Sequence, residues 1–416
     1  MTGAPGAGAF IPYGAYWSSP FCRWQGSFAH LHAFDLAALT ARQALQRRNI
    51  DLGILDAGVL GTTVPQRGSF YGLPWLAGEI GAPHLAGPTI AQACATSARV
   101  LATAASDLAQ GDATAVLTIT TDRVSNGPHI YYPAPHAPGG TGTHENWVLD
   151  NFERDPFAKL AMVQTAENVA QKYQIGTQEQ HDLVLRRFEQ YEEARQDGGA
   201  FQARYLEALE VPAPGRRGAT VPISADEGVQ AASAERMARL KPVMDGGTIT
   251  YAGQTHPADG TAGMIVASRD KARELASDPG ITVEILAFGQ AREARGMMPA
   301  APIPASERAL KQADLRIGDI TAVKSHNPFI VNDIAFARHF GVNPWTVMNN
   351  YGCSLVYGHP QGPTGMRVII ELIEELALRG GGYGLFNGCA AGDSAMALVL
   401  RVDDASSTTR RAGPEA

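Results

Sequence analysis

The amino-acid sequence predicts an α/β fold with two similar halves and an inserted loop domain. Apolar stretches of strand length alternate with alanine-rich helical stretches, which is typical of layered α/β proteins with largely parallel sheets. One strand–turn–helix–strand unit occurs twice, around Cys94 and around His359. Between the two units the sequence becomes charged but keeps helical periodicity, which indicates an inserted domain and not a linker.

Each unit consists of a small-residue turn, a helix with apolar residues at i, i+3 and i+4, and a buried strand. The first unit has its helix at Ser97–Gln110 and its strand at Ala115–Thr120. The second has its helix at Met366–Arg379 and its strand at Tyr383–Phe386. Sequence identity between the two units is slight, so the prediction of two similar halves depends on the order of the elements.

These two units, and the more charged composition of the segment between them, predict the domain organisation. A Pro/Gly/His-rich loop follows Arg123, and a charged helix is expected at Thr177–Gln196. The polar end of the chain, from Asp403 onward, has the composition of a disordered tail. The expected domains are an N-terminal half at 1–123 completed by 248–274, an inserted loop domain at 124–247, a C-terminal half at 275–403, and a tail at 404–416.

Composition excludes several classes of function. The chain has 416 residues and a net charge of −7, which argues against a nucleic-acid partner because such proteins need a basic face. It has no signal-peptide pattern and no apolar run of membrane-spanning length, so a soluble cytoplasmic protein is expected. The four cysteines have no CxxC spacing, so neither a metal site nor a disulfide framework is expected.

Four residues are candidates for catalysis. Cys94 lies on a turn directly before a helix, where the helix dipole is expected to lower the thiol pKa. His359 lies between small residues that would leave its ring accessible to a substrate. Cys389 lies in a small-residue loop after a strand, and His326 ends the predicted strand Ile320–Lys324. Each alone could be structural, a buried filler or a turn residue, but their combination is much less expected by chance.

The order of the motifs resembles the thiolase family from near Ile54 to Leu400. The resemblance is specific because a Gly-His-Pro motif and two cysteines occur in the family's order. The matching segments are Gln92-Ala93-Cys94, Arg123–Pro128, Met162–Ala170, Leu240-Lys241-Pro242, Asp259–Ala262, His326–Phe329, Gly358-His359-Pro360 and Gly388-Cys389.

The resemblance implies a five-layered α/β/α/β/α thiolase fold and a role for each candidate. Cys94 would carry the acyl group, and His359 would take its proton. Cys389 would move the proton at the α-carbon of the second substrate. The backbone N–H groups of Cys94 and Ala391 would form one oxyanion hole, and His326 would support another.

The resemblance also implies coenzyme A as a substrate, with no permanently bound cofactor and no metal. The expected substrate-binding residues are Met162, Phe329, Trp147 and His256. The loop Tyr131–Phe157, which contains Trp147, is longer than in typical acetoacetyl-type members and predicts a bulky, branched or aromatic acyl group. Four arginines could contact CoA phosphates, although solvated helix faces explain such runs more often: Arg186, Arg187, Arg216 and Arg217.

The chain departs from the commonest thiolase pattern at His326, where many members have asparagine. This departure keeps a ketoacyl-synthase-like condensing enzyme open as an alternative, whereas Cys389 favours a thiolase. A non-catalytic acyl or lipid carrier is a further alternative. The pattern resembles divergent bacterial thiolases that pair with a small zinc-ribbon/OB-fold subunit, such as those acting on benzoylsuccinyl-CoA. A homodimer or tetramer is expected, and the direction of the reaction stays open.

Overall fold

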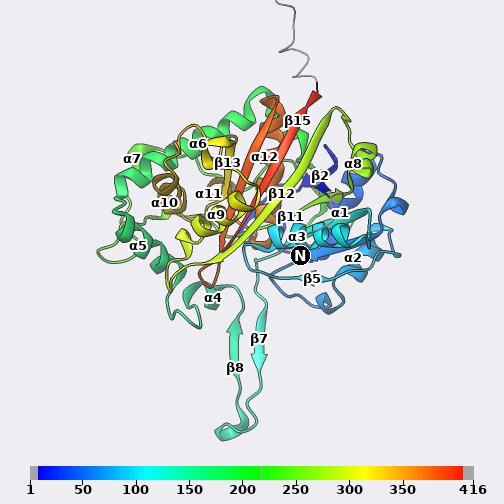
Figure 1. The fold of residues 1–416 in the computed structure, drawn as a ribbon. Coiled ribbons are helices and arrows are strands. Elements are labelled where there is room, and N and C mark those ends of the chain that lie inside the picture. Colours follow the sequence, from blue (N-terminus) through cyan, green and yellow to red (C-terminus); the bar gives the residue numbers. More distant parts are fainter. Residues whose placement is uncertain (1–7, 217, 406–416) are drawn as a thin grey trace, which may run out of the picture.

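A mixed sheet of eleven strands forms the centre of the protein in this computed structural model, which describes residues 8–216 and 218–405 (Figure 1). The short strand β1 (Ala9–Phe10) pairs with both β11 and β12 and thereby joins two half-sheets. The main order is β13-β14-β15-β12-β1-β11-β6-β4-β5, and β2 and β3 pair with β11 beside this path. The strands are β2 (Tyr16–Ser18), β3 (Cys22–Arg23), β4 (Ala57–Gly61), β5 (Thr89–Ile90), β6 (Ala115–Asp122), β11 (Ala258–Ala267), β12 (Ile281–Arg292), β13 (Ile320–His326), β14 (Gly381–Ala390) and β15 (Ser394–Asp404).

The prediction of largely parallel sheets is wrong. Among the strands of the described residues, only three pairs are parallel: β4 with β5, β4 with β6, and β13 with β14. A tight turn between β14 and β15 forces these two strands to be antiparallel, and β6 and β11 are antiparallel because the insertion returns the chain beside its point of departure.

Helices cover and separate the two half-sheets. The central layer contains α3 (Thr96–Gln110) and α12 (Gln361–Leu378), which contact each other and strands of both half-sheets. Helix α12 is buried from Gly362 to Leu376, as expected of a helix that is covered on every side. The outer layers are α1 (Ala33–Arg47) and α2 (Leu73–Ile80) on one half-sheet, and α9 (Pro302–Gln312) with α10 (Ile330–Phe340) beside it on the other. This is the predicted five-layered arrangement.

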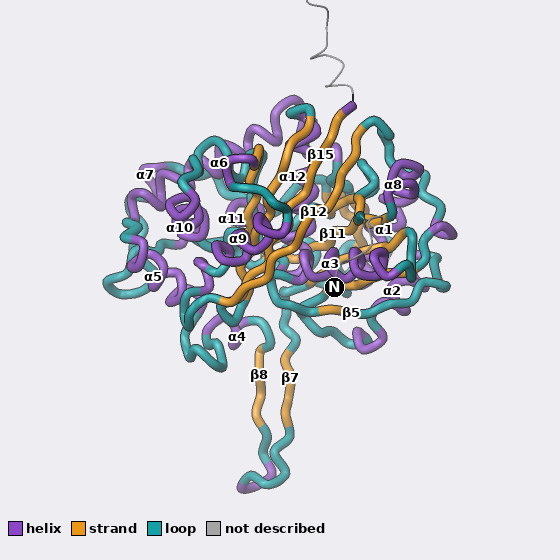
Figure 2. The backbone as a smooth tube through the Cα atoms, in the orientation of Figure 1, coloured by secondary structure: helices purple, strands orange, loops and turns teal. Residues whose placement is uncertain are grey.

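A long insertion leaves the sheet after β6 and returns at β11. Its hairpin β7–β8 extends away from the rest of the molecule as a narrow arm (Figures 1 and 2). The remaining insertion packs beside the C-terminal half, largely through contacts of α5 and α6 with α10. Its elements are β7 (His129–Tyr132), β8 (Thr143–Asn146), α4 (Leu149–Glu153), α5 (Met162–Tyr173), α6 (Thr177–Gly199), β9 (Leu209–Pro212), β10 (Thr220–Ile223) and α7 (Ala234–Met237). The exact domain boundaries stay predictions.

Other expectations have mixed outcomes. The helices expected at Ser97 and Met366 begin earlier, at Thr96 and Gln361. The start of the expected tail is wrong, because Asp403 and Asp404 belong to β15 and pair with β12, while residues 406–416 lie outside the described part of the chain. All four cysteines are buried and free. In the described ranges, no helix is both long and apolar enough to cross a bilayer. The short helices α8 (Arg269–Leu275) and α11 (Ser354–Tyr357) complete the fold.

Candidate active site

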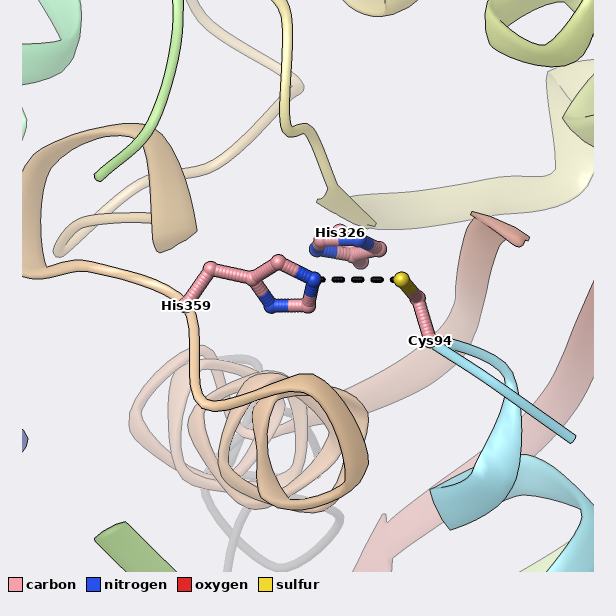
Figure 3. A group of neighbouring side chains, drawn as sticks. All are labelled: Cys94, His326 and His359. Atoms are coloured by element: carbon pink, nitrogen blue, oxygen red, sulfur yellow. Dashed lines mark hydrogen bonds between the residues drawn. The ribbon is translucent and has the colours of Figure 1, made fainter. Parts of the chain in front are cut away.

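Three of the predicted catalytic side chains lie together between the two halves (Figure 3). Cys94 comes from the turn before α3, His359 from the turn before α12, and His326 is the last residue of β13. The Cys94 sulfur and one ring nitrogen of each histidine lie within 4.8 Å of one another. No other group of three histidine, cysteine or acidic residues in the described chain is close enough to share a metal ion.

Cys94 is a neutral thiol in the resting protein. The turn that presents it is strained at Ala93, whose φ of 43° is unusual for a residue with a side chain. Burial raises the pKa of Cys94 to about 12, although hydrogen bonds from the backbone N–H groups of Ala391 and Cys94 itself lower it. The expectation of a lowered thiol pKa is therefore wrong, because loss of solvent outweighs the lowering by the backbone N–H groups. Attack by Cys94 requires a base.

His359 is placed to be that base. Its Nε2 lies 3.2 Å from the Cys94 sulfur, and its Nδ1 lies 2.7 Å from the Thr364 hydroxyl. The single hydroxyl proton of Thr364 is donated to the carbonyl of Pro360, at 2.6 Å. Thr364 must therefore accept the proton on His359 Nδ1, which leaves a lone pair on Nε2 facing the thiol. Burial lowers the pKa of His359 well below its usual value, and the neighbouring His326 and His256 lower it further.

Local packing fixes the turn that carries His359. Gly358 has a φ of 94°, and a Cβ there would lie 2.7 Å from His256 Nε2, so glycine is required. The buried carboxylate of Asp122, at the end of β6, accepts from the backbone N–H of Gly362 at 2.6 Å and from that of Thr63 at 2.7 Å. Asp122 thus connects the His359 turn to the N-terminal half.

His326 lies directly against His359, with 4.1 Å between ring centroids and 31° between ring planes. Its Nδ1 lies 3.1 Å from the Ser354 hydroxyl, and its Nε2 is buried without a hydrogen-bond partner. Burial lowers the pKa of His326 to about 3, so the ring is neutral. A neutral imidazole with a free, buried nitrogen can donate to a negatively charged oxygen if that nitrogen carries the proton.

Cys389, near the end of β14, lies close enough to feel a charge on Cys94. Burial raises its pKa, a charge on Cys94 raises it further, and a hydrogen bond from Asn332 lowers it. The Asn332 amide lies 3.3 Å from the Cys389 sulfur. Such a thiol can deliver a proton, and the thiolate that is left is stabilised by the hydrogen-bond donor beside it until it receives a proton again.

The predicted substrate-binding residues are divided between two cavities. The first, of about 470 Å³, is bordered by Ala93 and Ala391 beside Cys94 and includes Trp147 and Met162. The second, of about 590 Å³, includes His256. Phe329 is 6% exposed and lines neither cavity. Most of the β7–β8 arm points away from the first cavity. Only the part of the long loop from Glu145, at the base of the arm, onward lines it, with Glu145, Trp147, Val148, Asn151, Phe152, Asp155, Pro156 and Phe157.

Of the arginines proposed for CoA phosphates, the three that the structure describes do not form a site. Arg187 is fully buried and binds Asp333 at 2.9 Å, so it cannot meet a phosphate. Arg186 binds Glu189 and Glu193, and Arg216 lies at the tip of the β9–β10 hairpin. Arg217 is outside the described residues.

Sequence reasoning missed the residues that hold the catalytic groups: Asp122, Asn332, Ser354 and Thr364. Only Thr364 had a sequence signal, as a hydroxyl residue in the turn that follows the histidine. The others lie on different elements: Ser354 and Asn332 meet His326 and Cys389 within the C-terminal half, whereas the contact of Asp122 with the backbone of Gly362 joins the two halves.

Comparisons with known proteins match this chain over most of its length. Residues 16–270 match the family of thiolase N-terminal domains, and residues 280–402 match the family of thiolase C-terminal domains. An acetyl-CoA acetyltransferase of Paracoccus denitrificans is 30% identical over 92% of this chain and 96% of its own. A beta-ketothiolase of Cupriavidus necator is 27% identical, with 90% and 94% covered.

Solved structures with the same fold include a human mitochondrial 3-ketoacyl-CoA thiolase. That structure has a TM-score of 0.86 at 24% identity and covers 95% of this chain and 99% of its own. The same human protein in complex with CoA has a TM-score of 0.85, with 95% of this chain and 98% of that chain covered. An acetyl-CoA acetyltransferase from Bacillus anthracis has a TM-score of 0.87 at 24% identity and covers 96% and 100%.

Proposed function

This chain belongs to the thiolase family and is an acyltransferase, and from that premise we propose that it cleaves a 3-oxoacyl-CoA with CoA, or runs the reverse Claisen condensation, through an acyl group on Cys94. The observation that carries the proposal is the pair of Cys94 and His359. The thiol is neutral, and the nitrogen that faces it at 3.2 Å has its lone pair free because Thr364 holds the ring proton on the far side. That arrangement is what general-base activation of a nucleophile requires.

In the cleavage direction, His359 takes the thiol proton while the Cys94 sulfur attacks the 3-oxo carbon. The backbone N–H groups of Cys94 and Ala391, which meet at the sulfur, hold the oxyanion that forms there. The bond between C2 and C3 then breaks, and its electron pair becomes the enolate of the shorter acyl-CoA. Cys389 protonates that enolate at carbon, and His326 holds its oxygen. The thiol of a free CoA then attacks the acyl thioester and gives its proton to the Cys389 thiolate, while the Cys94 sulfur leaves and takes its proton back from His359.

The acyl group is proposed to be bulky, branched or aromatic. The cavity beside Ala93 and Ala391 supports this proposal, because its volume of about 470 Å³ exceeds the needs of an acetyl group. Its walls are largely aromatic and aliphatic. They include Trp147, Phe152, Phe157, Leu160, Met162 and Met298.

CoA, the proposed second substrate, is expected in the cavity that contains His256. The carbonyl of His256 accepts from the backbone N–H of His359 at 2.9 Å, so this cavity also reaches the catalytic turn. Arg23 and Arg236 line it and could meet phosphates, and neither was identified from the sequence. No permanently bound cofactor and no metal is proposed.

The assembly is proposed to be at least a dimer. The half-sheet of the N-terminal half ends at β5, whose Thr89 is exposed, so an edge is open for pairing with another chain. Phe70 and Tyr71, which precede α2, are 94% and 71% exposed and offer an apolar surface. A tetramer, a small zinc-ribbon/OB-fold subunit, a benzoylsuccinyl-type substrate and a cytoplasmic location stay predictions.

A second candidate function is condensation of the ketoacyl-synthase type. The observation that favours it is the close group of one cysteine and two histidines. Cys389 argues for the thiolase reaction, because its thiol lies close enough to feel a charge on Cys94 and has its own donor in Asn332. A role as a non-catalytic acyl or lipid carrier would leave these polar contacts without a use.

Intact-protein mass spectrometry after mixing with acyl-CoA and 3-oxoacyl-CoA thioesters tests the proposal. The panel contains acetyl, branched and benzoyl members, and Cys94→Ala is the control. A mass gain of one acyl group that is absent in the variant and removed by free CoA would support the acyl-cysteine route and identify the acyl class. Cys389→Ala is expected to keep acylation by a plain acyl-CoA and to lose carbon–carbon cleavage. Full activity of Cys94→Ala would refute the proposal.

A further inference from the structure

The buried contact between Ser354 and His326 has a consequence for where the ring proton of His326 lies. Ser354 begins helix α11, and its hydroxyl lies 3.1 Å from His326 Nδ1. The same hydroxyl accepts from the backbone N–H of Asn327 at 3.1 Å and lies 3.1 Å from the side-chain oxygen of Asn327. All three residues are buried, so water does not compete for these bonds.

The orientation of the Asn327 amide is fixed by its other partners. Its NH₂ group donates to the carboxylate of Asp333 at 2.9 Å, and Asp333 is ion-paired with Arg187. Its oxygen accepts from the backbone N–H of Leu355 at 3.2 Å. The Asn327 oxygen therefore already has a donor, and it does not depend on the Ser354 proton.

The single proton of Ser354 permits two arrangements. In the first, Ser354 donates to His326 Nδ1, and the ring proton lies on Nε2. In the second, Ser354 donates to Asn327, the ring proton lies on Nδ1, and Nε2 has a lone pair. Both arrangements satisfy Ser354 and Asn327, so the choice depends on what surrounds Nε2.

Counting protons around Nε2 favours the first arrangement. His359 Nε2 has a lone pair because Thr364 holds its ring proton on Nδ1, and the Cys94 thiol supplies one proton to it. In the second arrangement, His326 Nε2 would add another lone pair, so the one thiol proton would serve two ring nitrogens in a buried space. In the first, His326 Nε2 brings a second proton, which can point toward the Cys94 sulfur or toward a substrate oxygen.

We propose that Ser354 is a positioning residue that donates to His326 Nδ1 and so keeps the Nε2–H of His326 as a donor for the enolate oxygen. This inference rests on the proposed function and adds to it the residue that makes His326 competent. A lone pair at Nε2 would repel the enolate oxygen that it is required to bind. An asparagine at position 326 would need no such partner, because its amide always carries N–H groups.

The position of the proton can be measured directly on the unmodified enzyme. Two-dimensional ¹⁵N–¹H spectra of protein labelled in its histidine rings distinguish a protonated ring nitrogen from one with a lone pair. His326 is assigned by the signals lost in His326→Asn. We expect Nε2 of His326 to be protonated and Nδ1 not, whereas a lone pair on Nε2 would overturn the inference without any activity measurement.

Kinetics then separate the positioning role from a general effect of removing a buried hydroxyl. Acylation of Cys94 by benzoyl-CoA or butyryl-CoA breaks no carbon–carbon bond. Acylation by benzoylacetyl-CoA or 3-oxohexanoyl-CoA produces the same adducts only after cleavage. We expect Ser354→Ala to slow the cleavage-dependent route about 10-fold or more, toward the roughly 100-fold effect of losing one oxyanion donor, and to leave the plain route within about twofold.

Two controls complete the design. In a His326→Asn background, Ser354→Ala is expected to change cleavage by less than about threefold, because the coupling between the two sites is then removed. Ser306→Ala also removes a fully buried hydroxyl, on α9 and without a hydrogen-bond partner, and is expected to change neither route. Equal effects of Ser354→Ala in both backgrounds would overturn the inference. Absence of acylation from every thioester in the unmodified enzyme would instead overturn the proposed function, since the spectrum of His326 would be unaffected.

Discussion

Replacing Thr364 by valine tests the assignment of His359 as the base. Valine keeps the shape of threonine but cannot accept the proton on His359 Nδ1, to which the hydroxyl lies at 2.7 Å. A buried N–H left without a partner costs about 1–3 kcal/mol. The alternative form of the ring, with its proton on Nε2 facing Cys94, avoids much of that cost but has no lone pair for the thiol.

The size of the effect follows from that cost. Each 1.4 kcal/mol changes the ratio of the two ring forms tenfold, so the active form is expected to become about 10 to 100 times scarcer. The assay is rapid-quench intact-mass measurement of acyl-Cys94 formation from benzoyl-CoA, in the absence of free CoA. Acylation is expected to slow by the same factor, with little change in the apparent affinity for the thioester.

Thr364→Ser is the matched control, because it keeps the hydroxyl and loses only a methyl group. It is expected to acylate within about threefold of the unmodified enzyme, since the hydrogen bond to His359 is retained. Circular dichroism and the thermal midpoint confirm that both variants are folded. If Thr364→Val acylated as fast as Thr364→Ser, the hydroxyl would not determine the form of His359, and the reasoning would be refuted.

Three further predictions concern pH, metal ions and the acyl cavity. Burial lowers the pKa of His326 from about 6.5 in the unfolded chain to about 3. Between these pH values only the unfolded state takes up the proton, so the stability of the folded protein must decrease as pH falls through that window. Thermal midpoints measured from pH 7 to 4 should therefore decrease less steeply in His326→Asn than in the unmodified protein. Zn²⁺ should inhibit the enzyme, because a thiol and two imidazoles within 4.8 Å of one another can bind it. A chelator should restore activity. Equal Zn²⁺ affinity in His326→Asn and in the unmodified enzyme would contradict this geometry. Trp147→Ala should raise KM for an aromatic 3-oxoacyl-CoA about tenfold, because the substrate loses roughly one aromatic contact. KM for acetoacetyl-CoA should stay unchanged. An equal rise of KM for both substrates would show that Trp147 does not contact the acyl group.

The sequence was sufficient to predict the fold and to single out Cys94, His326 and His359, which lie together in the structure, because their signals are local. The motif around His359 and the two central helices can be read over a few residues, and both helices are present, although they begin earlier than expected, at Thr96 and Gln361. The parallel character of the sheet was predicted wrongly because strand direction depends on how distant segments return. The antiparallel pairing of β6 with β11, for example, spans the whole insertion.

The protonation of the site could not be predicted from local rules. A cysteine before a helix is expected to have a lowered thiol pKa, but Cys94 is buried by both halves at once, and burial raises its pKa to about 12. The same burial makes both histidines neutral. A neutral thiol and a neutral base form a different starting point from a thiolate and an imidazolium, and only the assembled structure distinguishes them.

The meeting of the two halves also explains why Cys94 faces His359 although 265 residues separate them. Helices α3 and α12 touch near their N-terminal ends, where the Ser97 hydroxyl donates to the carbonyl of Gly362 and a Cβ at Gly365 would lie 3.0 Å from Ser97. Cys94 precedes Ser97 by three residues, and His359 precedes Gly362 by three. Because equivalent positions of two similar units meet, the residues that precede each helix are brought together by the same contact. A larger residue at Gly365 would therefore separate the base from the thiol, while each helix could still form.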